Sequence, residues 1–202
     1  VLAIEILIGM LSDLGLDAII MRSKQGAEPA FLATARTMQL ARSLFIAFIM
    51  VAVAAVLPPL AASGFFPKGS VYTDPRLPWF MALMALSVVV TGFNAMRVAL
   101  HNRSLNLIPV IRLELGAQAI GVAATVAGAL AGFGAYALAF GGVIGASAKS
   151  LGSHFLLSGP PARFGFDRAH FKEIFGYGKW LLLASTLGWL VQRGDQVLFG
   201  WL

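Results

Sequence analysis

The 202-residue chain contains no cysteine and few charged residues. The absence of cysteine excludes disulfide bridges, thiolate metal sites and cysteine nucleophiles. Its three histidines, His101, His154 and His170, lie far apart and match no metal-ligand spacing, so we expect no metal and no cofactor. Charged residues make up 12% of the sequence and hydrophobic residues 58%. A water-soluble core cannot bury that much apolar surface, which predicts a protein of the lipid bilayer.

Catalytic motifs are also missing from the sequence. It has no glycine-rich phosphate loop, no nucleophile elbow and no pair of histidines one helical turn apart, so we expect a protein that is not an enzyme. The net charge of +6 would fit nucleic-acid binding in a soluble protein. Here the basic residues form short clusters between apolar runs, which is typical of membrane topology, and we expect no nucleic-acid partner.

Long apolar runs predict the fold class. A helix needs roughly 20 apolar residues to cross the hydrocarbon core of a bilayer. The predicted spans are residues 1–21, a segment within 42–68, 77–100, 111–131, 135–157 and 175–201. Gly132, Phe133 and Gly134 divide the charge-free stretch 115–148 into a hairpin, and Pro58 and Pro59 kink or end the second span. We therefore predict an all-α, polytopic transmembrane bundle with about six spans.

A proline-rich connector suggests the domain organisation. Residues 158–163 contain Pro160 and Pro161, and Asp167 can cap a short amphipathic helix that ends near Phe175. We expect residues 1–158 to form most of a first helical lobe, 159–175 a cytoplasmic connector with an interfacial helix, and 176–202 the first helix of a second lobe. The chain begins inside an apolar run without methionine, and we expect it to be an internal piece of a longer protein.

Basic residues alternate between the connections. Residues 22–42, 97–112 and 149–179 together hold twelve lysines and arginines, whereas the two other connections hold Lys68 and Arg76. Cytoplasmic loops of membrane proteins are enriched in Lys and Arg. The three basic connections are therefore predicted to be cytoplasmic.

Ionisable residues within the predicted spans are candidates for function, because charge at membrane depth is costly. Asp13 and Asp17 lie one helical turn apart and can bind a cation or pair with an arginine. Equally, residues 12–15 can form a structural turn. The other polar clusters are Arg112, Glu114 and Gln118 near the fourth span, and Arg193 and Asp195 in the last. Small residues at 124, 128 and 132 and at 141 and 145 indicate close helix packing.

Several short motifs resemble one known family. They are residues 11–17 (LSDLGLD), 112–114 (RLE) followed by the hairpin at 132–134, 164–167 (FGFD), 175–180 (FGYGKW) and 194–200 (GDQVLFG). In this order they resemble the polysaccharide biosynthesis proteins, the O-antigen and exopolysaccharide flippases of the multidrug/oligosaccharidyl-lipid/polysaccharide exporter superfamily. The likeness covers nearly the whole chain.

The resemblance implies two six-helix, MATE-like lobes around a central cavity that opens alternately to each side of the bacterial inner membrane. It implies that undecaprenyl-pyrophosphate-linked oligosaccharide crosses from the cytoplasmic to the periplasmic leaflet, with membrane lipids, a polysaccharide polymerase and export machinery as further partners. The fragment looks like the second to the seventh helix. Cationic cavity walls suit a pyrophosphate, so Arg97, Arg112 and Arg193 are the best binding candidates, accompanied by Glu114, Gln118 and Asp195. Asp13 and Asp17 are possible ion-coupling residues.

Other functions stay open on the sequence alone. A cation-coupled multidrug antiporter of the same superfamily would use an acidic cluster, for which Asp13 and Asp17 qualify. A membrane-embedded glycosyl or acyl transferase would need paired carboxylates or a histidine on a large external loop, and residues 63–78 supply only Asp74. A structural membrane subunit is a further alternative.

Overall fold

The computed structural model describes residues 15–64, 73–161 and 163–199. In these residues the regular structure is helical and contains no strand, which confirms the all-α class. The helices are α2 (Leu16–Arg22), α3 (Pro29–Ala62), α4 (Leu77–Gly92), α5 (Arg97–Arg103), α6 (Leu107–Leu130), α7 (Tyr136–Phe155) and α8 (Arg168–Phe199). Most of the first predicted span, residues 1–14, lies outside the described residues.

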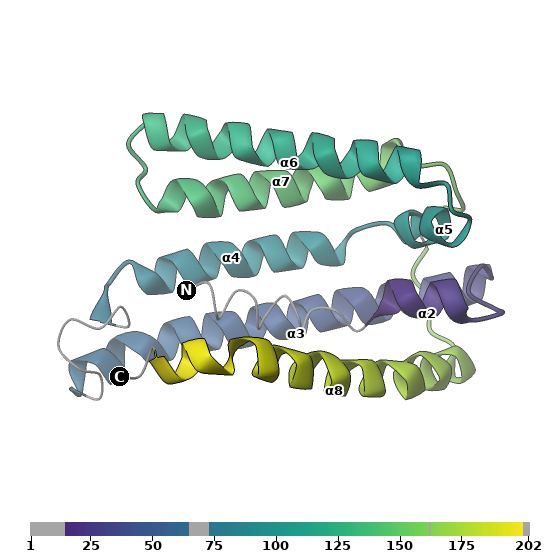
Figure 1. The fold of residues 1–202 in the computed structure, drawn as a ribbon, viewed down its shortest axis with the longest axis horizontal. Coiled ribbons are helices and arrows are strands. Elements are labelled where there is room, and N and C mark those ends of the chain that lie inside the picture. Colours follow the sequence, from purple (N-terminus) through teal and green to yellow (C-terminus); the bar gives the residue numbers. More distant parts are fainter. Residues whose placement is uncertain (1–14, 65–72, 162, 200–202) are drawn as a thin grey trace.

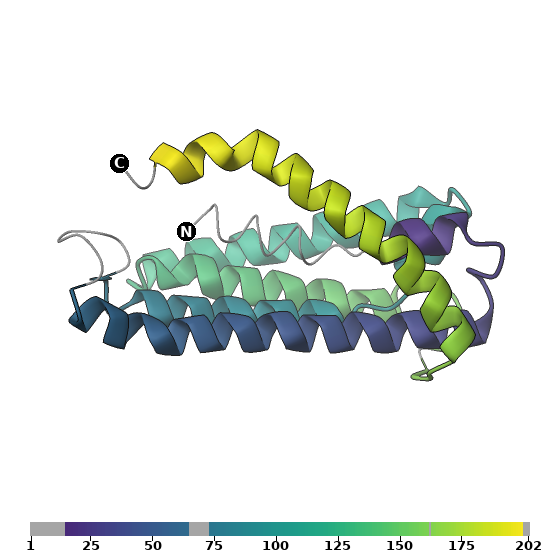
Figure 2. The ribbon, with the colours of Figure 1, turned by 90° about the horizontal axis from the view of Figure 1, so that it is seen from below.

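Helices α3, α4, α7 and α6 run parallel to the long axis of the molecule and lie side by side in that order across it (Figure 1). Helix α8 contacts α2 and α3 and then slants away from this layer toward its C-terminal end (Figure 2). The outward faces carry large apolar side chains: Phe45 and Phe48 of α3 are 64% and 71% exposed. An apolar surface of this kind is what a lipid-facing helix requires.

Two of the described helices, α3 and α6, are long and apolar enough to cross a membrane. A third span results if α4 and α5, which are bent by 60° at the short break between them, are counted as one. The count of six spans stays a prediction.

The three basic connections meet at one end of the bundle. The loop before α3, helix α5 and the connector from α7 to α8 lie together at the right of Figure 1, and the C-terminal end of α3, the start of α4 and the loop joining α6 to α7 lie at the other end. A small apolar core packs α2, α3, α5 and α8 together at this basic end. It includes Ile20, Phe31, Ala99 and Ile174. The side of the membrane that this end faces stays a prediction.

The hairpin predicted at residues 132–134 is confirmed. Gly132 and Gly134 have φ angles of 84° and 54°, a left-handed backbone region that glycine adopts without strain. Helices α6 and α7 then approach closely where Gly121 faces Gly141 and Gly145: a Cβ on Gly121 would lie 3.1 Å from the Gly141 carbonyl oxygen. The structure thus confirms the small-residue packing at Gly128, Gly141 and Gly145 and adds Gly121.

Several predicted boundaries were wrong. The segment expected as a loop before Arg42 is helical from Pro29, because proline suits a first helical turn and no breaker follows it until Pro58. Pro58 and Pro59 do not stop α3, which ends at Ala62. Helix α2 starts at Leu16 after a left-handed Gly15 (φ 57°), so the first predicted span is interrupted there.

The short amphipathic helix predicted at 167–175 is instead the first part of the 32-residue helix α8. Asp167 caps it as expected, since its Oδ1 accepts hydrogen bonds from the backbone amides of Ala169 (2.7 Å) and His170 (3.2 Å). Gly176 and Gly178 lower helix propensity but do not end the helix. The proposed division between connector and second lobe thus falls inside a continuous helix.

Candidate functional site

A polar cavity of about 210 Å³ lies near the basic end, between α2, α3, the α4–α5 break, α6 and α7. Apolar helices surround it, yet much of its lining can donate or accept hydrogen bonds. The polar lining residues are Asp17, Gln39, Arg42, Ser43, Thr91, Asn94, Asn102, Glu114 and Lys149. A cavity of this kind within a membrane bundle is a candidate site for a polar solute.

Glu114 and Lys149 form an ion pair across the α6–α7 hairpin, with Oε1 and Nζ 2.9 Å apart. The two side chains are 43% and 35% exposed. Both also line an open groove of about 530 Å³ that follows α6 and α7 past Gln118, Gly121 and Thr125. The ion pair therefore lies where the polar cavity and the groove meet.

The break between α4 and α5 is held by side chains from two neighbouring helices. Gln39 Nε2 of α3 donates to the carbonyl oxygens of Thr91 (3.0 Å) and Gly92 (3.3 Å). From α7, Ser153 Oγ accepts the Ala95 amide at 2.9 Å. These bonds replace helical ones that the break removes, so irregular backbone persists within the bundle with partners for its backbone groups at Thr91, Gly92 and Ala95.

Arg97, a predicted substrate-binding residue, binds the end of α7 and the connector that follows it. Its Nη1 donates to the carbonyl oxygens of His154 (2.5 Å) and Leu157 (2.9 Å), and its Nε donates to that of Pro160 (3.2 Å). Terminal helix carbonyls have no intrahelical partner, so a cation placed there is favourable. In this arrangement Arg97 fixes the connector, and it also lines a second cavity, described below.

The structure brings together some of the predicted site residues and separates others. Asp17 and Glu114 line the polar cavity, and exposed Gln118 lines the adjoining groove. Arg112 is exposed and lines neither of them. Asp13 and the side chains of Arg193 and Asp195 lie outside the described part of the chain.

The sequence reasoning missed Gln39, Asn94 and Lys149 as cavity residues. Lys149 could have been paired with Glu114, because the two lie at similar distances from the hairpin at Phe133 and an antiparallel hairpin brings such positions together. Gly92 and Asn94, interrupting an apolar run, were a signal for the helix break. No comparable signal marked Gln39, whose role depends on which helix lies beside α3.

Comparison with known proteins adds the family. A family model described as polysaccharide biosynthesis protein matches residues 1–202, the full length of the chain. No curated protein and no solved structure gives a significant match. The match agrees with the resemblance noted in the motifs, and the outward-facing apolar helices are those of a membrane protein. The chain belongs to the polysaccharide biosynthesis protein family.

Proposed function

We propose that the protein is a transporter that moves an undecaprenyl-pyrophosphate-linked oligosaccharide from the cytoplasmic to the periplasmic leaflet of the bacterial inner membrane. The observation that carries the proposal is the polar cavity within an apolar helical bundle, in a chain that belongs to a polysaccharide biosynthesis family. A lipid-linked sugar has a polar head that must cross hydrocarbon and a polyprenyl tail that can stay in lipid. A polar path inside the bundle lowers the cost for the head alone.

The Glu114–Lys149 ion pair has a specific role in this proposal. It lies between the cavity and the groove, so a polar head that passes from one to the other must pass it. A pyrophosphate competes with Glu114 for the Lys149 ammonium, because both are anionic acceptors for the same donor. The substrate thereby replaces Glu114 as the partner of Lys149.

The hairpin and the broken helix give the bundle parts of different rigidity. Helices α6 and α7 meet through glycines with no room for a side chain between them, so they are expected to move as one body. The α4–α5 junction is instead held by a few side-chain hydrogen bonds, which involve Gln39 and Ser153. We place the hinge of the alternating movement at this junction.

The test is complementation of a deletion strain with the full-length gene and with a Lys149→Gln variant. Surface polysaccharide is measured with a lectin, and lipid-linked oligosaccharide is quantified in extracted lipids. A transporter defect leaves completed lipid-linked oligosaccharide accumulated in the membrane while surface polysaccharide falls. A strain that accumulates only incomplete, shorter lipid-linked sugars contradicts transport and favours a transferase.

A further inference from the structure

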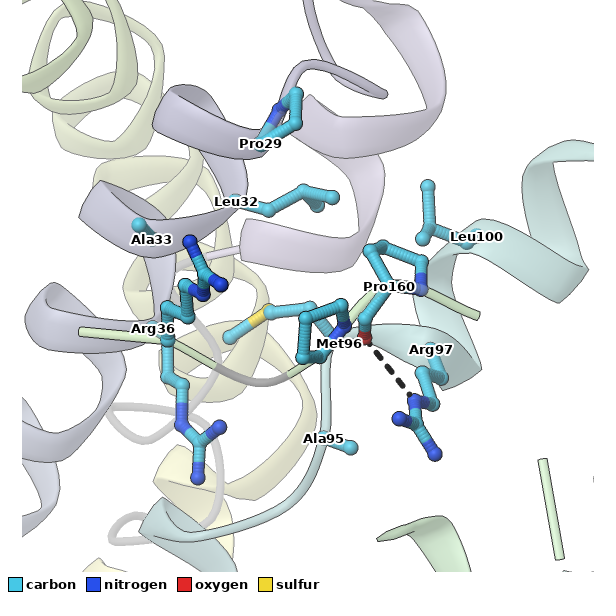
Figure 3. A pocket seen from close by; sticks show the side chains of 11 residues that line it. Pro29, Leu32, Ala33, Arg36, Ala95, Met96, Arg97, Leu100 and Pro160 are labelled. Atoms are coloured by element: carbon cyan, nitrogen blue, oxygen red, sulfur yellow. Dashed lines mark hydrogen bonds between the residues drawn. The ribbon is translucent and has the colours of Figure 1, made fainter. Parts of the chain in front are cut away.

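A second cavity, distinct from the polar cavity, lies at the basic end (Figure 3). It has a volume of about 260 Å³ and is enclosed by the first turns of α3, the start of α5 and the α7–α8 connector. Each of the three basic connections therefore contributes to it. Three arginines line it, Arg36, Arg97 and Arg163, and none of the described lining residues is acidic.

Arg36 is the most unusual of these arginines. The residue is only 7% exposed, and its Nε and Nη1 atoms are buried without a hydrogen-bond partner. Its guanidinium carbon lies 4.4 Å from the centre of the Phe164 ring, which provides a cation–π contact but accepts no directed hydrogen bond. Burial of a guanidinium with unsatisfied donors is costly, so Arg36 can bind an acceptor that the described part of the chain does not supply.

Arg97 uses its donors differently. Its bonds to the carbonyl oxygens of His154, Leu157 and Pro160 hold the connector against α5. The contact is tight, because a Cβ on Gly159 would lie 3.0 Å from Arg97 Cγ. The connector is thereby placed so that Arg163 lines the same cavity as Arg36.

The rest of the lining is apolar and includes Pro29, Leu32, Met96, Leu100, Pro160 and Pro161. Arginines beside an apolar wall match a ligand that combines a compact anion with a hydrocarbon portion. Guanidinium groups bind phosphate oxygens in pairs, and lysine and arginine at the cytoplasmic end of a membrane protein attract anionic headgroups.

We propose that this cavity binds the phosphate group of a lipid, held by Arg36 and Arg163, and that occupation fastens the α7–α8 connector to the start of α3. The site does not require the transport proposed above. A phospholipid headgroup, the pyrophosphate of a polyprenyl lipid and free phosphate share the chemistry, and only the pyrophosphate source rests on the proposed function.

The test uses the full-length protein in nanodiscs that contain equal amounts of phosphatidylglycerol and phosphatidylcholine. Native mass spectrometry counts the lipids that stay bound when the nanodisc is removed. We expect preferential retention of phosphatidylglycerol, and a loss of affinity of about tenfold or more in Arg36→Gln and in Arg163→Gln. Arg168→Gln is the matched control, because Arg168 is an exposed arginine at the same end that does not line the cavity.

Competition identifies the source of the phosphate. Displacement of phosphatidylglycerol by millimolar inorganic phosphate points to a free-phosphate site. Displacement by undecaprenyl pyrophosphate that is sub-stoichiometric to phosphatidylglycerol points to the polyprenyl lipid. If Arg36→Gln fails to fold, Arg163→Gln decides alone, since Arg163 lies on the exposed connector. Equal retention of both phospholipids with no competition by either phosphate compound, or an equal loss in Arg168→Gln, overturns the proposal.

Discussion

Lys149 Nζ and Glu114 Oε1 meet at 2.9 Å across the α6–α7 hairpin, at the level where the polar cavity joins the groove. The pair is part-exposed, so its strength resembles that of a surface ion pair more than that of a buried one. Its position between the polar cavity and the groove makes it the best-defined contact of the candidate site.

Charge exchange tests this pair. Glu114→Lys or Lys149→Glu alone places like charges together and should lower both the melting temperature in detergent and polysaccharide export. The double variant restores the attraction, and we expect a coupling free energy of about 1 kcal/mol in the stability cycle. If export as well as stability recovers in the double variant, the pair acts only through structure. Recovery of stability without export supports a role for Lys149 in substrate binding.

The glycine contact between α6 and α7 predicts that alanine lowers stability at Gly141 but not at Gly116. A Cβ at Gly141 would overlap Thr125 Oγ1 and lie 2.7 Å from the Gly121 carbonyl oxygen. Gly141→Ala should therefore cost about 1–3 kcal/mol, as overpacking typically does. Gly116→Ala is the control, because a Cβ there meets nothing within 4 Å. Thermal unfolding of the two purified variants should differ clearly, and equal melting temperatures would contradict the close contact.

Gln39 is expected to stabilise the α4–α5 break. Gln39→Leu leaves the carbonyl oxygens of Thr91 and Gly92 without its amide, and we expect a loss of about 1–3 kcal/mol. Ser63→Ala removes only a local bond to the Leu60 carbonyl at the exposed end of α3 and serves as the control. Hydrogen exchange at residues 91–98 should rise in Gln39→Leu and stay unchanged in Ser63→Ala. Unchanged exchange in both would show that the break does not depend on Gln39.

The cap of α8 should respond to pH. Hydrogen bonds from the Ala169 and His170 amides hold the pKa of the Asp167 carboxyl below its usual value, despite a small opposing effect of desolvation. A lowered pKa means that the cap is fully formed above the unfolded-state pKa of aspartate and is lost as the pH falls through the folded-state pKa. Exchange of the Ala169 amide should accelerate in that acidic range. In Asp167→Asn the cap persists and this acceleration should disappear.

The absence of cysteine makes topology directly measurable, since any introduced thiol is unique in the chain. Cysteine at Lys24, Ser104 or Arg168, at the basic end, should be shielded from an impermeant thiol reagent in intact cells. Cysteine at Asp74 or Phe133, at the opposite end, should be labelled. Labelling of both ends from outside would contradict the predicted orientation.

Local sequence was sufficient for the hairpin and for the cap of α8. Gly132 and Gly134 supply the left-handed backbone of a turn, and Asp167 supplies the cap, so each feature depends on residues that are neighbours in sequence. Asp17 and Glu114 were also recognised, because charge inside an apolar run is conspicuous.

Features that depend on distant segments were missed. The α4–α5 break persists because side chains from two other helices bind its backbone: Gln39 donates to the Thr91 carbonyl and Ser153 accepts from the Ala95 amide. The carbonyl contacts of Arg97 were not predicted, because the sequence does not show that residues 154–160 return to it; the same side chain also lines the second cavity. The six-span count rests on apolar runs and on the alternation of basic residues between connections, and α3 and α6 are the described helices that meet the length and apolarity criteria individually.

The three carbonyl contacts of Arg97 have a mechanical consequence. They join α5 to the C-terminal end of α7 and to Pro160, only eight residues before Arg168, where α8 begins. A tilt of α7 relative to α5 must therefore break these contacts, whereas a tilt of the two helices together carries the segment before α8 with them. The direction in which α8 leaves the layer therefore depends on how the α6–α7 hairpin packs. Arg97 provides this connection although it lines neither the polar cavity nor the groove.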